Sequence, residues 1–360
     1  MLNLGKRSLL KITVSALCVA ATTQMLHADE PIPVVATFSI LGNMVSEIGG
    51  EHVNVTTLVG PDGDAHVYQP TPKDARSVSE AELMFMNGLE FEGWLERLVK
   101  AASFDGSLVV ATDGIQAIGF DDHNDHDDHA DHQDHDDHKD HNDHDDHADH
   151  QDHDDHDDHD DHQDHDDHKD HDDHDDHDDH SGHNHGAFDP HAWHSLTNAA
   201  IYIDNITAAL AKADPSNAGD YYSNRAKYLS ELDALSKDVA SMMADIDADK
   251  RTVVTPHDAF GYFSVAYDVT FEAPQGLSTE SEASAADVAR LIEQIREQNI
   301  SAVFIESISD NRLIEQIANE TGASVGGTLY SDALSSSDGP ASNYLDMFRH
   351  NAKTISDALK

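Results

Sequence analysis

Histidine recurs at every third position, with aspartates between, from residue 121 to residue 180. This Asp/His tract contains 20 His, 31 Asp and 2 Lys, which gives it a formal charge of −29, and its apolar residues are Ala130 and Ala148. Because such a composition cannot bury a hydrophobic core, we predict a disordered loop over 121–187. The string NDHDDHADHQDHDDH begins at 124 and again at 142, a sign of growth by duplication that tolerates changes in length. The folded protein must therefore be built from the sequence on either side.

The charge of the chain limits its partners. The formal net charge is −50, and the part outside the tract contributes −21. Phosphate binding needs a basic surface, so we expect no nucleic-acid partner. A field of this sign attracts cations.

Residues 1–28 have the pattern of a secretory signal peptide. A basic start that includes Lys11 precedes an apolar run over 12–21, which is too short for a stable membrane anchor. The sequence Leu26-His27-Ala28 is a plausible cleavage motif, so the mature chain is expected to begin near Asp29. We predict export to the periplasm.

Cys18, the only cysteine, lies inside this signal segment. Leu17 precedes it, at a place where lipoprotein signals carry a small residue, so we expect that the protein is not a lipoprotein. The mature protein would then have no disulfide and no thiolate metal site.

Short apolar runs alternate with helical patterns on both sides of the tract, which indicates an α/β fold with largely parallel sheets. The expected strands cover 33–38, 53–59, 83–87, 108–111, 252–256, 269–273, 302–305 and 325–330. The expected helices cover 40–48, 72–81, 195–213, 217–247, 285–298, 312–320 and 343–359, with a further helix around Trp94, Leu95 and Leu98.

This order predicts two α/β lobes joined by one long backbone helix. The N-terminal lobe spans 29–216 and contains the loop 121–187, the helix spans 217–247, and the C-terminal lobe spans 248–360. At ~1.5 Å per residue the helix would reach roughly 45 Å, long enough to connect both lobes. We expect a ligand-binding cleft between the lobes.

Several chemistry-bearing residues follow predicted strands. His66 and His191 belong to the first lobe, and His257 and Asp332 to the second. Ligands gather outside the carboxyl ends of parallel strands, so these four side chains could converge on one ion. Each also has a simpler interpretation, because a loop histidine is more often a surface residue and Asp332 could cap a turn. Spacing alone does not choose between His191 and His194.

The chain resembles the metal-binding periplasmic proteins of ABC importers known as cluster A-I. The resemblance is carried by TFSILGNMVSEIGGE, LVGPDGDAHVYQPTPKD, NGLEFEGWLERL, DPHAWHS, HDAFGYF, FIESISDNRL and LYSDALS, together with the Asp/His insert before DPH. It is closest to the ZnuA-like zinc branch, including its AztC-like members. The resemblance implies that His66, His191, His257 and Asp332 are the metal ligands, and it favours His191 over His194. Ala65 stands where a proline is common in the family, and His194 is an additional histidine.

Three imidazoles and one carboxylate suit Zn²⁺, because more oxygen ligands would favour Mn²⁺. We therefore predict a zinc-binding protein, not an enzyme, that carries Zn²⁺ as transported ligand to an inner-membrane ABC permease. A separate periplasmic zinc chaperone is a second expected partner, and we expect a monomer. The His123–His180 tract, with His183 and His185, is expected to be an auxiliary and weaker zinc collector.

Two other functions fit parts of the pattern. One is a zinc buffer or metal-dependent adhesin in which the tract itself is the functional element. The other is a zinc hydrolase, since three histidines and a water form a catalytic zinc site. Against the hydrolase, the chain has no HExxH motif, and Asp332 would fill the position that a catalytic water needs.

Overall fold

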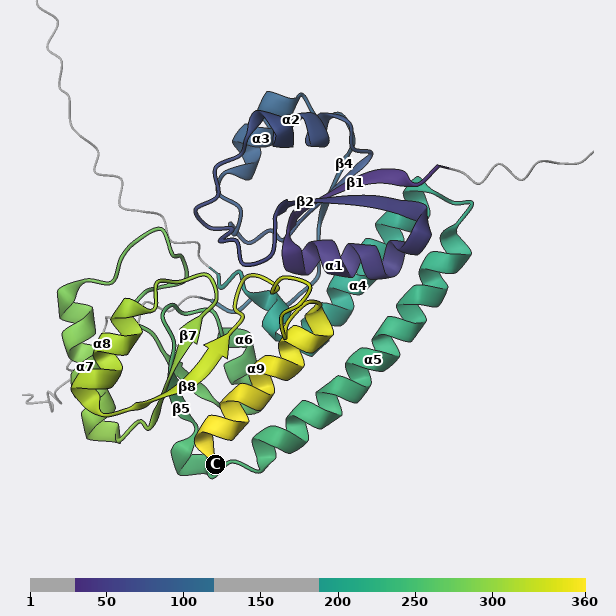
Figure 1. Cartoon of the computed structure of the whole chain (residues 1–360). Helices are drawn as coiled ribbons and strands as arrows, with labels where there is room; N and C mark the ends of the chain where they lie inside the picture. Colours follow the sequence, from purple (N-terminus) through teal and green to yellow (C-terminus); the bar gives the residue numbers. More distant parts are fainter. Residues whose placement is uncertain (1–29, 120–187) are drawn as a thin grey trace, which may run out of the picture. The chain divides into compact units, whose positions relative to one another are not determined.

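The computed structural model describes residues 30–119 and 188–360 (Figure 1). The predicted signal peptide and the Asp/His tract lie outside the described residues. Both sheets of the described part belong to one compact unit.

The first sheet has four parallel strands in the order β2-β1-β3-β4. Its central strand β1 reads IPVVATF and is buried along most of its length, as expected for a parallel strand covered on both faces. The strands are β1 (Ile32–Phe38), β2 (Val53–Val59), β3 (Leu83–Met86) and β4 (Ser107–Val110). The helices of this part are α1 (Ser39–Gly49), α2 (Pro72–Ser79) and α3 (Leu95–Ala102), with the 3₁₀ turn η1 (Gly50–His52).

The second sheet repeats this arrangement, with four parallel strands in the order β6-β5-β7-β8. The strands are β5 (Thr252–Val254), β6 (Thr270–Glu272), β7 (Ala302–Glu306) and β8 (Ser324–Leu329). The helices are α6 (Gly261–Tyr267), α7 (Ala285–Gln298), α8 (Arg312–Thr321) and α9 (Tyr344–Leu359), and η3 (Ala248–Lys250) precedes β5. Helix α6 is missing from the sequence prediction, because its short aromatic and β-branched sequence, which opens on Gly261, carries little helical signal.

Between the sheets the chain forms η2 (Ala192–His194), α4 (Leu196–Ala213) and α5 (Ala218–Ala244). Helix α5 has 27 residues and therefore a length of ~40 Å. It packs against α1 and α4 on the first lobe and against α9, which in turn packs on β8 of the second lobe (Figure 1). The predicted fold class, two parallel-sheet α/β lobes joined by a long helix, is confirmed.

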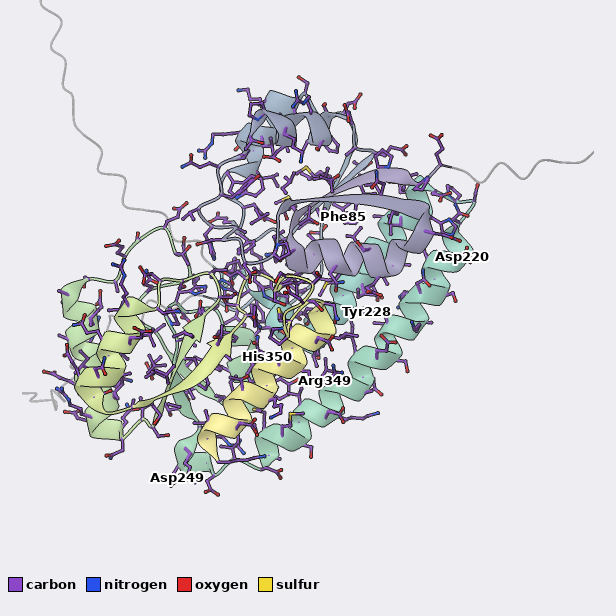
Figure 2. The ribbon with its side chains drawn as sticks, in the orientation of Figure 1. Phe85, Asp220, Tyr228, Asp249, Arg349 and His350 are labelled. Atoms are coloured by element: carbon purple, nitrogen blue, oxygen red, sulfur yellow. The ribbon has the colours of Figure 1, made fainter. Side chains whose placement is uncertain are left out.

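One hydrophobic core runs through both lobes. It includes Phe85 of β3, which Figure 2 labels, as well as Phe260 and Phe348 of the second lobe. A smaller cluster lies between α7, α8 and β7. Because the main core is continuous, the lobes are held together by buried side chains as well as by the chain connections. None of the helices in the described ranges has the length and hydropathy to cross a membrane.

Trp193 lies at the centre of this shared core. Its ring packs against Phe38 and Phe91 of the first lobe, with ring centroids 5.0 and 4.9 Å away. Its indole Nε1 donates to the carbonyl of Ser331 at 2.8 Å, and its own carbonyl accepts a 2.6 Å hydrogen bond from the hydroxyl of Tyr344. Turn η2 is therefore joined to the first lobe by packing and to the second lobe and α9 by buried hydrogen bonds.

We predict that Tyr344→Phe lowers the free energy of unfolding of the metal-free protein by ~1–3 kcal/mol, because the buried carbonyl of Trp193 loses its donor. Urea denaturation followed by circular dichroism measures this loss. Tyr222→Phe is the matched control, since Tyr222 is 53% exposed and its replacement should change the value by less than ~0.5 kcal/mol. Equal effects of the two substitutions would contradict the prediction.

Candidate metal centre

The structure brings together the four residues that the sequence predicted as metal ligands. His66, His191, His257 and Asp332 each offer one ligand atom, and these atoms all lie within 4.8 Å of one another. His66 is 7% exposed and the other three are fully buried. Among the described residues this is the one such cluster of His, Cys, Asp and Glu side chains that could hold a metal ion.

Each of these residues comes from a loop next to a sheet or from the turn between the lobes. His66 follows β2, His257 follows β5 and Asp332 follows β8, while His191 immediately precedes η2. The carboxyl ends of the parallel strands of both sheets thus supply three of the four side chains, in agreement with the general position of ligand sites in such sheets.

The carboxylate of Asp332 lies at the centre of the cluster. Its Oδ2 is 3.2 Å from His66 Nε2 and 3.3 Å from His257 Nε2, and its Oδ1 is 3.6 Å from His191 Nε2. The Nε2 atoms of His66 and His191 are 3.4 Å apart. Apart from these imidazoles, neither oxygen of Asp332 has a hydrogen-bond partner among the described residues. A buried carboxylate needs a nearby cation to offset its desolvation.

Two further carboxylates, which the sequence analysis missed, orient two of the imidazoles. Asp189 Oδ1 lies 2.8 Å from His191 Nδ1 and also accepts the backbone N–H of His191 at 2.9 Å. Glu306 Oε2 lies 2.5 Å from His257 Nδ1. A carboxylate at Nδ1 keeps a proton on that nitrogen and leaves Nε2 as the metal-binding atom. The Asp two residues before His191 and the Glu at the end of β7 were the only sequence signals for these roles.

Charge governs the protonation of the cluster. Burial alone would lower the pKa of His257, but the carboxylates of Glu306 and Asp332 raise it well above its ordinary value. Burial alone would raise the pKa of Asp332, but His257 and His191 hold it well below its ordinary value. In the metal-free protein the favoured state is therefore an ionised Asp332 beside a protonated His257.

His194, the alternative to His191, lies outside the cluster. Its Nε2 donates to the carbonyl of Ser331 at 2.9 Å, and its ring packs against Phe260. His350 on α9, which Figure 2 labels and which the sequence analysis did not weigh, donates to the carbonyl of Thr328 at 3.0 Å. His52 pairs with Asp220 at 2.9 Å. These three histidines have structural partners and do not point to a second metal site.

The loop that carries His66 is fixed from both lobes. The ring of Phe91 packs edge-on against His66 at 4.7 Å, and Trp94 Nε1 donates to the carbonyl of Ala65 at 2.8 Å. Asp64 accepts the backbone N–H of His66 through Oδ1 and the hydroxyl of Thr279, from the second lobe, through Oδ2 at 2.6 Å. Asp64 thus connects the His66 loop to the opposite lobe.

A buried polar network supports the segment before His191. Asn87 donates through Nδ2 to the carbonyl of Pro190 at 2.9 Å, and Tyr202 donates to the side-chain oxygen of Asn87. Glu92 accepts the backbone N–H of Asn87 at 2.6 Å, and burial raises the pKa of Glu92. This network fixes the backbone from which His191 projects.

The two ends of the interval that contains the tract lie side by side. The backbone N–H of Asp189 donates to the carbonyl of Ile118 at 2.9 Å. The hydroxyl of Tyr262 accepts from the backbone N–H of Ile118 at 3.2 Å and donates to the carbonyl of Asp189 at 3.0 Å. The interval 120–187 is thus an insertion at one point of the fold, close in sequence to His191. His183, His185 and the rest of the predicted collector lie outside the described residues.

Relatives of known role match almost the whole chain. The manganese-binding lipoprotein MntA of Bacillus subtilis is 29% identical over 92% of this chain and 91% of its own length. The iron ABC transporter substrate-binding lipoprotein MtsA of Streptococcus pyogenes is 26% identical over 99% of both. Such relatives are solute-binding proteins of ABC transporters, which are not enzymes.

These relatives correct one prediction from the sequence. MntA of B. subtilis and MtsA are lipoproteins, so the expectation that this protein is not a lipoprotein is wrong. That expectation depended on the size of one side chain, Leu17, before Cys18, in a segment outside the described residues. A single unfavourable side chain in a short signal is weaker evidence than relatives that match 92% or more of the chain.

Solved structures with the same fold carry different metals. A Mn-bound periplasmic metal-binding protein from Candidatus Liberibacter asiaticus has a TM-score of 0.68 and 29% identity, over 91% of this chain and 99% of that one. A Cd-bound form of the protein from this organism has a TM-score of 0.68 and 29% identity over the same shares. The periplasmic zinc-binding protein TroA of Treponema pallidum has a TM-score of 0.71 at 24% identity, over 92% of this chain and 99% of that one, and supports the fold alone.

The family model described as zinc-uptake complex component A, periplasmic (ZnuA), matches residues 34–358. This range includes both sheets, apart from the first two residues of β1, and all four clustered residues. The chain therefore belongs to the ZnuA family and is the periplasmic metal-binding, substrate-binding component of an ABC metal importer, with an inner-membrane permease as its partner.

Proposed function

We propose that this protein binds one Zn²⁺ tightly through His66, His191, His257 and Asp332 and delivers it to the permease. The convergence of three imidazole nitrogens and one carboxylate, buried and within 4.8 Å of one another, carries this proposal. The proposal places the chain in the zinc branch of its family, near the AztC-like members.

The spacing of the ligand atoms supports a four-coordinate ion. A tetrahedral site with Zn–N bonds of ~2.0–2.1 Å has neighbouring ligand atoms ~3.3–3.4 Å apart. The contacts around Asp332 and between His66 and His191 range from 3.2 to 3.6 Å. These contacts are close to the tetrahedral spacing, and all the ligand atoms lie within 4.8 Å of one another, so the cluster could bind zinc after a modest contraction.

The donor set supports zinc over manganese. Imidazole suits Zn²⁺, whereas Mn²⁺ prefers carboxylate, carbonyl and water oxygens. Several relatives are named for manganese binding, which favours Mn²⁺ as the second candidate. Both oxygens of Asp332 face the imidazoles of the cluster and could bind a larger ion together. Hydrolysis is disfavoured, because Asp332 fills the position that a catalytic water needs.

We further propose that the His123–His180 tract collects zinc for this site. Neutral imidazoles among aspartates bind zinc, but a segment whose composition builds no hydrophobic core loses conformational entropy when it wraps an ion, so we expect its sites to be weaker. The tract ends 11 residues before His191 in the sequence, which supports the idea that it passes ions to this site. Exchange with a separate zinc chaperone, a monomeric state, and the division into lobes 29–216 and 248–360 also stay proposals.

His257→Asp should weaken zinc binding more than ~100-fold and manganese binding much less, because it replaces an imidazole with an oxygen ligand. Competition with a chelator that removes weakly bound ions measures both affinities at the tight site. His52→Ala is the control and should change neither value, since His52 lies outside the cluster. Tighter binding of manganese than of zinc by the unmodified protein would overturn the zinc proposal.

Zinc binding should release about one proton from His257, because its raised pKa keeps Nε2 protonated in the metal-free protein at neutral pH. Between the unfolded pKa of ~6.5 and the raised folded pKa, protonation of His257 stabilises the metal-free fold, and this stabilisation is lost as pH rises. Zinc affinity should therefore increase by about tenfold per pH unit in that window.

Isothermal titration in buffers of different ionisation enthalpy counts the released protons. Glu306→Gln removes one of the two carboxylates that raise the pKa of His257, so this variant should release fewer protons. The prediction fails if the two proteins release the same number.

Deletion of residues 121–180 should remove several weakly bound zinc ions and leave one zinc ion bound at the tight site. The weaker ions should dissociate first as pH falls below ~6, because imidazoles must be deprotonated to bind zinc. Mass spectrometry of the native protein over a pH series gives the stoichiometry. An unchanged number of bound ions after the deletion would contradict a collecting role.

A further inference from the structure

We propose that His194 is a positioning residue, which fixes the carboxylate of Asp332 relative to His191 across the boundary between the lobes. This inference rests on the proposed function, since it takes His191 and Asp332 as metal ligands. His194 is the additional histidine of the sequence, and it does not belong to the cluster.

The carbonyl of Ser331 joins these ligands. It accepts a 2.8 Å hydrogen bond from Trp193 Nε1 and a 2.9 Å hydrogen bond from His194 Nε2. Both donors belong to η2, which directly follows His191, and Ser331 directly precedes Asp332. Short stretches of backbone therefore connect both proposed ligands to one carbonyl oxygen that accepts two hydrogen bonds.

The imidazole of His194 is held in the state that this role needs. A carbonyl oxygen only accepts, so Nε2 must carry the proton. The ring packs between Phe260 at 4.5 Å and Trp193 at 5.8 Å, which restricts its rotation.

Ser331 is also connected to a third proposed ligand, His257, through Glu306. Its hydroxyl donates to Glu306 Oε2 at 3.1 Å, the oxygen that lies 2.5 Å from His257 Nδ1. A shift of Ser331 would therefore move Asp332 and disturb the orientation of His257 together. Since outer hydrogen bonds of this kind typically change metal affinity by about 10–100-fold, the His194 bond should affect how long the ion stays bound.

The test is the zinc dissociation rate of the full chain, measured with an excess of a colorimetric chelator. His194→Leu introduces an apolar side chain of similar size that has no hydrogen-bond donor. We therefore expect the slow phase of zinc dissociation, which comes from the tight site, to become at least about tenfold faster. His194→Gln retains an N–H that reaches Ser331 and should stay within about threefold of the unmodified protein. His194→Asn, whose amide is too short, should resemble His194→Leu.

The chain offers a matched control in His350→Leu. His350 also donates to a backbone carbonyl of the second lobe, that of Thr328, but this carbonyl is not adjacent to a ligand. His350→Leu should leave the dissociation rate unchanged even where it lowers the free energy of unfolding. Equal acceleration by His350→Leu and His194→Leu would reduce His194 to a structural role and overturn the proposal.

A spectroscopic measurement separates ligand position from stability. In NMR spectra recorded with one equivalent of ¹¹³Cd²⁺ per protein, the resonance of the tight site should be sharp in the unmodified protein and in His194→Gln. It should be shifted or broadened in His194→Asn and His194→Leu. Unchanged spectra and rates in these last two variants would refute the positioning role. If His257→Asp also had no effect on the tight site, the proposed ligand set itself would be wrong, and the two failures are thereby distinguished.

Discussion

The carboxylate of Asp332 is the group on which the rest of the site depends. It is fully buried, and its closest polar neighbours are the Nε2 atoms of His66 and His257, at 3.2 and 3.3 Å. Burial of an uncompensated carboxylate costs several kcal/mol, so the surrounding groups must supply positive charge. In the metal-free protein that charge is the proton of His257. A divalent ion supplies more charge at the same place, and this is why the fold favours metal binding.

This requirement explains why the lobes are joined so extensively. The four clustered residues come from loops far apart in sequence. If the two lobes were independent, ordering these loops would cost conformational entropy and reduce the free energy of ion binding. The continuous core, helix α5 and the hydrogen bonds of η2 provide this order in advance. The bond between Asp64 and Thr279 adds a contact on the His66 side. Preorganisation of this kind raises affinity without adding ligands.

Much of this architecture could be predicted from sequence, because strands and long helices leave periodic patterns. The segment 53–59 and the segment 285–298 agree with β2 and α7 along their whole length. The seven-residue helix α6 was not predicted, because a short helix stabilised by tertiary packing has little local sequence signal. Loops after strands indicated His66, His257 and Asp332, but the choice of His191 over His194 needed the family resemblance. The contacts of Glu306 and His194 are hydrogen bonds between segments far apart in sequence, which no local pattern encodes, whereas Asp189 bonds to His191 only two residues away.

The fold itself does not select the metal. Relatives that match this chain over nine-tenths or more of its length are named for manganese and iron, and a solved structure of similar coverage is Cd-bound. Selectivity must then arise from the donor atoms and from the groups that hold them. In this chain, His191 and His257 each offer an imidazole nitrogen to the cluster, and each has a carboxylate at its other ring nitrogen, Nδ1. A carboxylate behind an imidazole makes the nitrogen a stronger donor, whereas a carboxylate in its place would favour a harder ion. The positions of Asp189 and Glu306, directly behind the imidazoles of His191 and His257, therefore connect the shared fold to the proposed preference of this chain for zinc.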